Sequence, residues 1–75
     1  MQSGDMEWIN TPESSSIAAY AYSSQEMYLY VRFKNGRTYR YSGVPATVFS
    51  SFTRASSKGT FFNSQIQGQY SYSTI

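Results

Sequence analysis

The sequence contains neither cysteine nor histidine, and only four of its 75 residues are acidic. Without cysteine no disulfide can cross-link the fold, and without either residue type a structural zinc ion lacks its usual ligands. General acid–base catalysis normally needs a histidine or a placed carboxylate. Ser57 and Lys58 do not form a catalytic dyad, because adjacent residues on a helix point apart. We therefore predict a protein that is not an enzyme and that uses no metal and no cofactor.

Long apolar runs are missing too. No stretch approaches the roughly 18 residues of a membrane span, and the chain does not open on the basic-then-apolar pattern of a signal peptide. We expect a soluble, cytoplasmic protein without a membrane partner, and the lack of cysteine is compatible with that compartment.

Negative charge is confined to the first part of the chain. The four acidic residues all lie within positions 1–26, whereas the six basic residues lie between positions 32 and 58. Residues 27–75 therefore carry six positive charges and no negative one. A region of one sign attracts polyanions or acidic protein surfaces, although a solvated basic surface that maintains solubility is the simpler alternative.

Aromatic residues, in contrast, are abundant at 19%. A domain of this length buries only about 60% of its unfolded surface, so large rings are needed to build its core. The eight tyrosines form four Tyr-x-Tyr pairs, at positions 20/22, 28/30, 39/41 and 70/72. Residues two apart lie on one face of a β-strand. Each pair therefore belongs either to a core or to a binding surface.

Alternating hydrophobicity predicts three strands, at residues 15–22, 27–34 and 37–41, with a possible short fourth strand at residues 69–73. Asn35-Gly36 indicates a hairpin. A two-residue loop would turn Arg40 towards the core without a nearby acid, which is costly. A three-residue loop with Gly36 left-handed instead pairs Val31 with Tyr39 and turns Tyr39 and Tyr41 inward. We expect the second register.

Two short helices complete the predicted domain. The first begins near Pro45 and places apolar residues at helical spacing, and the second covers about residues 58–66 with Ser57 as its N-cap. The predicted fold class is α+β, a three-stranded antiparallel sheet packed against two short helices. Residues 14–75 form this single domain. Residues 1–13 lack periodicity and are expected to be a flexible arm, in which Trp8 and Ile9 are the anchors.

The chain contains, in this order, the stretches SSSIAAYAY, LYVRFKNGRTYRYSGVP and ASSKGTFFNSQIQGQY. Together they resemble the KTSC domain, a small bacterial and phage domain named after the C-terminus of certain lysyl-tRNA synthetases. The resemblance covers roughly residues 14–72. It implies that Tyr39 and Tyr41, on the family's own YxY, are packing residues, and its association with a synthetase suggests RNA binding. The chain departs from the family pattern in having Tyr28 and Tyr30 where polar residues are expected, and Ser23 where an aspartate is usual.

The leading hypothesis is a non-catalytic module that binds RNA or single-stranded nucleic acid. Tyr28 and Tyr30 lie on the strand face opposite the aliphatic residues and would stack on bases. The phosphates would be held by Arg32, Arg40 and Lys58, and the surrounding positive field would come from Lys34, Arg37 and Arg54. Ordinary cross-strand Tyr–Arg packing on a solvated face is the alternative for this surface.

A second candidate site is SSKGT, residues 56–60. If a helix begins there, Ser57 and its free backbone N–H groups favour an anion beside Lys58, although a simple serine cap explains the same residues. The competing function is a regulator, for example phage-encoded, that docks on an acidic protein surface with its exposed Tyr and Arg residues. A third possibility is a structural unit that associates with itself through its tyrosine face.

Overall fold

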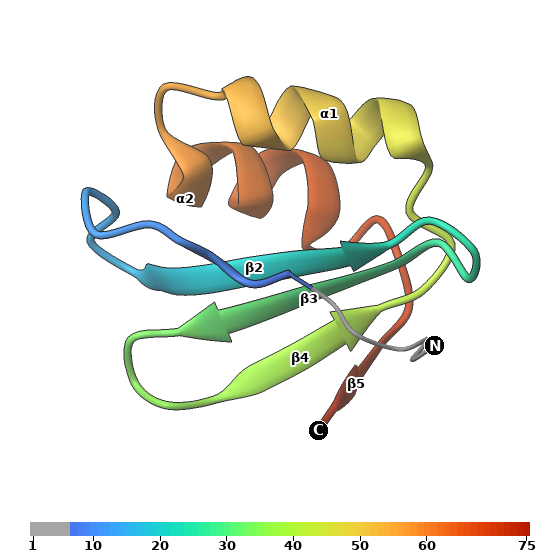
Figure 1. Cartoon of the computed structure of the whole chain (residues 1–75), viewed down its shortest axis with the longest axis horizontal. Helices are drawn as coiled ribbons and strands as arrows, with labels where there is room; N and C mark the ends of the chain where they lie inside the picture. The colour runs from blue at the N-terminus through green and yellow to red at the C-terminus, as the bar shows by residue number, and fades with distance from the viewer. Residues whose placement is uncertain (1–6) are drawn as a thin grey trace.

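The computed structural model describes residues 7–75, so the part of the predicted flexible arm that comprises residues 1–6 lies outside the described residues. The described chain is an α+β domain, as predicted, in which two helices cover one face of an antiparallel sheet (Figure 1). The sheet follows the chain order, and its strands are β1 (Ile9–Asn10), β2 (Ile17–Ser23), β3 (Tyr28–Phe33), β4 (Thr38–Tyr41) and β5 (Tyr72–Thr74).

The expected count of three strands is wrong, because both edges of the sheet carry a further short strand. Strand β5 corresponds to the possible C-terminal strand and pairs with β4. Strand β1 lies within the predicted arm and pairs with β2 through Ile9–Tyr20 and Asn10–Ala19. Two residues are too few to give an alternation of hydrophobicity, so this pairing left no signal in the sequence.

The β3–β4 hairpin has the predicted register. Val31 pairs with Tyr39, and the amide of Phe33 donates to the carbonyl of Arg37 at 2.8 Å. Gly36 has a φ of 94°, the left-handed conformation on which the three-residue loop depends. As a result Tyr41 is buried and Tyr39 is half-buried on the side of the helices, while Arg40 lies on the opposite face.

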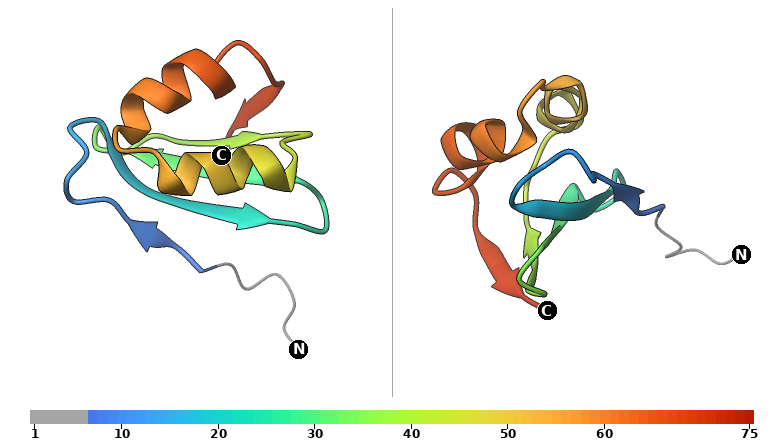
Figure 2. Two further views of the ribbon diagram at one scale, coloured as in Figure 1. Left: turned by 90° about the horizontal axis from the view of Figure 1, so that it is seen from above. Right: turned by 90° about the vertical axis from the view of Figure 1, so that its left-hand side faces the viewer.

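The helical layer lies on one side of the sheet (Figure 2). Helix α1 (Ala46–Arg54) starts directly after Pro45. Helix α2 (Lys58–Phe61) continues into the π-helical turn η1 (Phe62–Ile66), which together span the predicted residues 58–66. Ser57 is the N-cap, since its hydroxyl accepts a hydrogen bond from the amide of Thr60.

The core lies between this layer and the sheet. It is built from the following buried side chains: Ile17, Tyr20, Leu29, Val31, Tyr41, Val44, Phe52, Phe62 and Ile66. A bulge between Ile17 and Ala19 allows Ile17 and Tyr20 to share the core although strict alternation would put them on opposite faces. The same bulge leaves the two small residues Ala19 and Ala21 on the face away from the helices.

Candidate functional site

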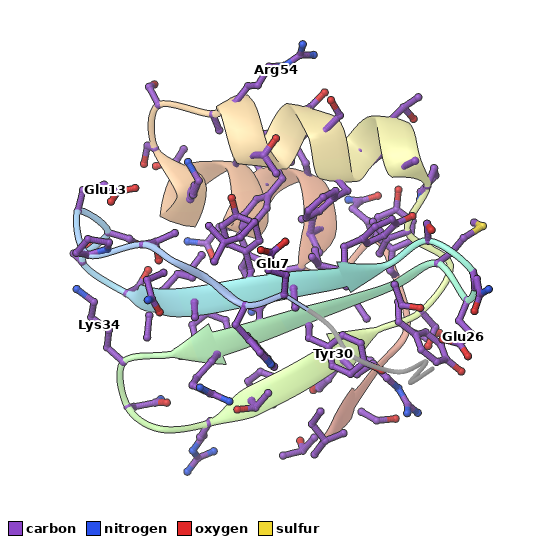
Figure 3. The ribbon with its side chains drawn as sticks, in the orientation of Figure 1. Glu7, Glu13, Glu26, Tyr30, Lys34 and Arg54 are labelled. Carbon is purple, nitrogen blue, oxygen red and sulfur yellow. The ribbon has the colours of Figure 1, made fainter. Side chains whose placement is uncertain are left out.

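The face of the sheet away from the helices, here called the open face, collects four of the nine predicted site residues. Tyr28, Tyr30 and Arg32 alternate along β3 with the core residues Leu29 and Val31. In the β3–β4 register Tyr30 lies directly opposite Arg40. Figure 3 shows the labelled Tyr30 on the sheet, below the helical layer.

Guanidinium groups and aromatic rings are in direct contact on the open face. The Arg40 guanidinium carbon lies 4.5 Å from the ring centroid of Tyr28, and that of Arg32 lies 4.4 Å from the ring centroid of Trp8. Tyr30 meets Tyr28 at 6.2 Å and Trp8 at 6.3 Å between centroids, both edge to face. We call this chain of contacts, Arg32–Trp8–Tyr30–Tyr28–Arg40, the aromatic–arginine ladder.

The ladder consists of cation–π and edge-to-face aromatic contacts, and both kinds of contact are attractive. A cation over an aromatic face gains about 0.5–1 kcal/mol at an exposed site, and edge-to-face aromatic pairs add comparable amounts. Arg40 is half-buried, and its Nε is fully buried with no hydrogen-bond partner among residues 7–75. Its guanidinium packs on the Tyr28 ring.

Trp8 enters the ladder from the start of the described chain. It precedes β1, and its side chain is half-buried. The chain is fixed at Thr11, which is buried and bonded through its amide and its hydroxyl to the carbonyls of Ala18 and Ile17. The sequence singled out Trp8 as an anchor of the arm but did not assign it to the site, because nothing local indicates which face it contacts.

The hairpin residues Lys34 and Arg37 lie at one end of the sheet and are exposed. The Lys34 ammonium donates to the carbonyl oxygen of Pro12 at 3.5 Å, and in Figure 3 its side chain extends from the β3–β4 turn towards the loop that precedes β2. Both residues add positive potential beside the open face. Arg54 does not, because it projects from α1 on the opposite side of the molecule (Figure 3).

Ser57 and Lys58 also lie in the helical layer, away from the ladder. The Ser57 hydroxyl bonds to Thr60, and the Lys58 ammonium donates to the carbonyl of Ala55 at 3.2 Å. Both residues line an open cleft of about 460 Å³ whose other wall is the loop at residues 13–16. Glu13 contributes to that wall and opposes an anion. The structure thus places four predicted site residues on the open face, Lys34 and Arg37 at the hairpin end, and Arg54, Ser57 and Lys58 in the helical layer.

Three tyrosines on the helix side behave as core residues. Burial raises the pKa of Tyr41 and Tyr20 above their ordinary value, as it does for Tyr22. Tyr22 donates a hydrogen bond to the carbonyl of Val44 at 2.6 Å and stacks on Phe49 at 4.4 Å. These side chains hold the helices on the sheet and are not available to a ligand.

Within residues 7–75, no three acidic, histidine or cysteine side chains gather in a way that would bind a metal ion. None of the helices in that same part of the chain is both long and apolar enough to span a membrane.

Comparison with known proteins gives one consistent result. The family model of the KTSC domain matches residues 13–70. A lysine–tRNA ligase of Nostoc sp. is 39% identical over 64 residues, which make up 85% of this chain but only 11% of the ligase. A protein of Tsukamurella paurometabola is 40% identical over 58 residues, 77% of this chain and 87% of that protein.

A solved structure extends the likeness to three dimensions. The crystal structure of a KTSC domain protein from Yersinia pestis superposes with a TM-score of 0.87 at 33% sequence identity, covering 95% of this chain and 99% of that one. The same unit therefore occurs as a small part of a tRNA ligase and as a protein of about this size.

Proposed function

The chain belongs to the KTSC domain family, and from that premise we propose that it is a non-catalytic module that binds RNA or another single-stranded nucleic acid through its open face. The observation that carries this proposal is the pair of guanidinium groups, Arg32 and Arg40, each held against an aromatic ring on one exposed sheet surface. Strands β3 and β4 contain no acidic residue that would neutralise them.

Pre-positioned arginines favour phosphate binding because little side-chain freedom is lost when the ligand arrives. Arg32 is exposed, so its remaining N–H groups face solvent. Lys34 and Arg37 at the end of the sheet would extend the positive surface along a phosphate backbone. With three or four phosphates neutralised, we expect a salt-sensitive Kd of about 10⁻⁴–10⁻⁶ M.

The two tyrosines have different roles in this proposal. Tyr28 positions Arg40, whose guanidinium covers one face of its ring. Tyr30 contacts its neighbours edge to face and carries no guanidinium, so it is the tyrosine best suited to stack on a base. The relationship to lysine–tRNA ligases supports RNA as the ligand, because such an enzyme acts on a tRNA, although the matched region is a small part of it.

The test compares two arginines of equal charge on opposite sides of the molecule. A fluorescein-labelled oligouridine is titrated with wild-type protein and with the Arg32→Gln and Arg54→Gln variants, and anisotropy is read at several salt concentrations. Arg32→Gln should weaken binding about tenfold and lower the magnitude of the log–log salt slope by about 0.7, the value for one phosphate on a single strand. Arg54→Gln should change both quantities little.

Equal losses in the two variants would contradict the proposal, because they would mean that net charge alone drives binding and the open face is not the site. A salt-independent affinity would contradict it as well.

An acidic protein surface is the second candidate partner, because Trp, Tyr and Arg are the residue types that dominate protein-interface energetics. A competition experiment distinguishes nucleic acid from an acidic protein surface as the partner. Unlabelled oligouridine should displace the labelled strand, whereas polyglutamate of equal charge should displace it only weakly if bases and phosphates are recognised. Displacement by polyglutamate at equal charge would favour the acidic protein surface.

A further inference from the structure

On the open face, β2 presents two alanines, Ala19 and Ala21. Ala19 pairs with Arg32 and Ala21 pairs with Tyr30, so two small side chains lie next to two large ones. We call the surface of these two alanines the alanine seat. Ala19 and Ala21 are 3% and 0% exposed although they face away from the helices, so other side chains cover them. Trp8 is placed to do so, since the β1–β2 register, extended by one residue, sets it beside Ala21.

The contacts of Trp8 are of a kind that proteins also use to bind nucleobases. A guanidinium lies 4.4 Å from its ring centroid, and Tyr30 meets it edge to face. Proteins hold unpaired bases in the same way, between arginine planes and aromatic rings above apolar side chains. An indole and a nucleobase are both flat and aromatic, and the indole has two fused rings, as a purine does.

The attachment of Trp8 is weak compared with that of the chain that follows it. Strand β1 has only two residues, Ile9 and Asn10, and both are exposed. The nearest firm anchor is the buried Thr11. The chain before Thr11 can therefore leave the sheet without disturbing that anchor, and such short edge strands belong to the least stable parts of a domain.

We infer that the alanine seat is a binding site for one base of a single-stranded nucleic acid, and that Trp8 occupies it in the free protein as an intramolecular competitor. This inference rests on the proposed function of the open face. Departure of Trp8 releases Arg32, which is then free to hold the base or its phosphate.

The experiment compares Trp8→Ala with Ile9→Ala in the full chain, using the same labelled oligouridine. Ile9 is the next residue and pairs with Tyr20, so its side chain lies towards the other face of the sheet. Trp8→Ala empties the seat and should tighten binding about fivefold, the equivalent of one lost cation–π contact. Ile9→Ala alters the same strand without emptying the seat and should stay within about twofold of wild type. Thermal unfolding by circular dichroism confirms that both variants fold.

Wild-type protein provides a second measurement, because Trp8 is the single tryptophan of the chain. Saturating oligouridine should shift the tryptophan emission to longer wavelength and increase its quenching by acrylamide as the indole moves into water. Binding seen by anisotropy with an unchanged Trp8 spectrum, or weaker binding by Trp8→Ala, would overturn the inference and leave the proposed function intact. The latter result would make Trp8 a contact residue. No anisotropy change with wild type or either variant would overturn the proposed function and the seat together.

Discussion

Replacing Arg40 with methionine should make the domain more stable while weakening its binding of nucleic acid. The Arg40 Nε is buried and has no hydrogen-bond partner within residues 7–75. Leaving a buried donor unsatisfied costs about 1–3 kcal/mol. The contact of the guanidinium with Tyr28, at 4.5 Å from the ring centroid, returns only about 0.5–1 kcal/mol. From the difference between those two magnitudes, we expect this arginine to lower the free energy of unfolding by about 1 kcal/mol.

Methionine is the informative replacement because it keeps a long, flexible side chain against Tyr28 and contributes a sulfur–aromatic contact of about 0.3–1.5 kcal/mol. Arg40→Met should therefore raise the free energy of unfolding by about 1 kcal/mol, which corresponds to about 4–8 °C in Tm for a domain of this size. The measurements are urea unfolding, with a higher midpoint and an unchanged m value, and thermal unfolding by circular dichroism.

The matched control is Arg54→Met, since Arg54 is exposed on α1 and makes no contact with the ladder. Its stability should stay within about 0.5 kcal/mol of wild type. If Arg40→Met instead lowered the free energy of unfolding by more than about 1 kcal/mol, the guanidinium would be a structural requirement of the sheet. A stabilised variant that bound oligouridine as well as wild type would show that Arg40 is not part of the binding surface.

Two further predictions concern the fold. Gly36→Ala should lower the free energy of unfolding by about 1–2 kcal/mol. A Cβ at this position would meet no neighbouring atom within 4 Å, but at φ 94° it strains the backbone. In urea unfolding Gly36→Asn should lose less stability than Gly36→Ala, and equal stability of wild type and both variants would contradict the left-handed loop. Above about pH 10 the domain should lose stability as pH rises, because the raised pKa values of Tyr20 and Tyr41 keep both phenols protonated in the folded state while the unfolded chain ionises. Urea midpoints at about pH 8 and pH 11 test this, and Tyr20→Phe should reduce the difference; a midpoint independent of pH would refute it.

The central hairpin could be predicted from sequence because two local constraints agree there. Alternation fixes which residues of β3 face inward, and the cost of burying Arg40 without an acid selects the three-residue loop. The observed pairing of Val31 with Tyr39 follows from those two facts alone. The helix at residues 58–66 was predictable for a similar reason, since Ser57 is a local capping signal.

The edges of the sheet could not be predicted in this way. Strand β1 joins the sheet through two backbone pairs, so its formation depends on a free edge of β2 whose paired residues lie nine and eleven positions away in sequence. The bulge between Ile17 and Ala19 likewise leaves no local signature, although it decides that Ile17 enters the core and that two alanines face outward. The base site that we propose at the alanine seat depends on both features.

The composition of the candidate site was predictable, but its contacts were not. The alternation of side chains along β3 and β4 places Tyr28, Tyr30 and Arg40 on one face of the sheet. The strand register makes Tyr30 the direct cross-strand neighbour of Arg40. The guanidinium nevertheless lies over Tyr28, the diagonal neighbour, and Tyr30 is packed between two other rings. Diagonal pairs of this kind are within reach of long side chains on a twisted sheet, and side-chain packing, not register, decides between them. Under the proposed function that choice would give the two tyrosines different roles: Tyr28 would position a cation for phosphate, and Tyr30 would stack on a base.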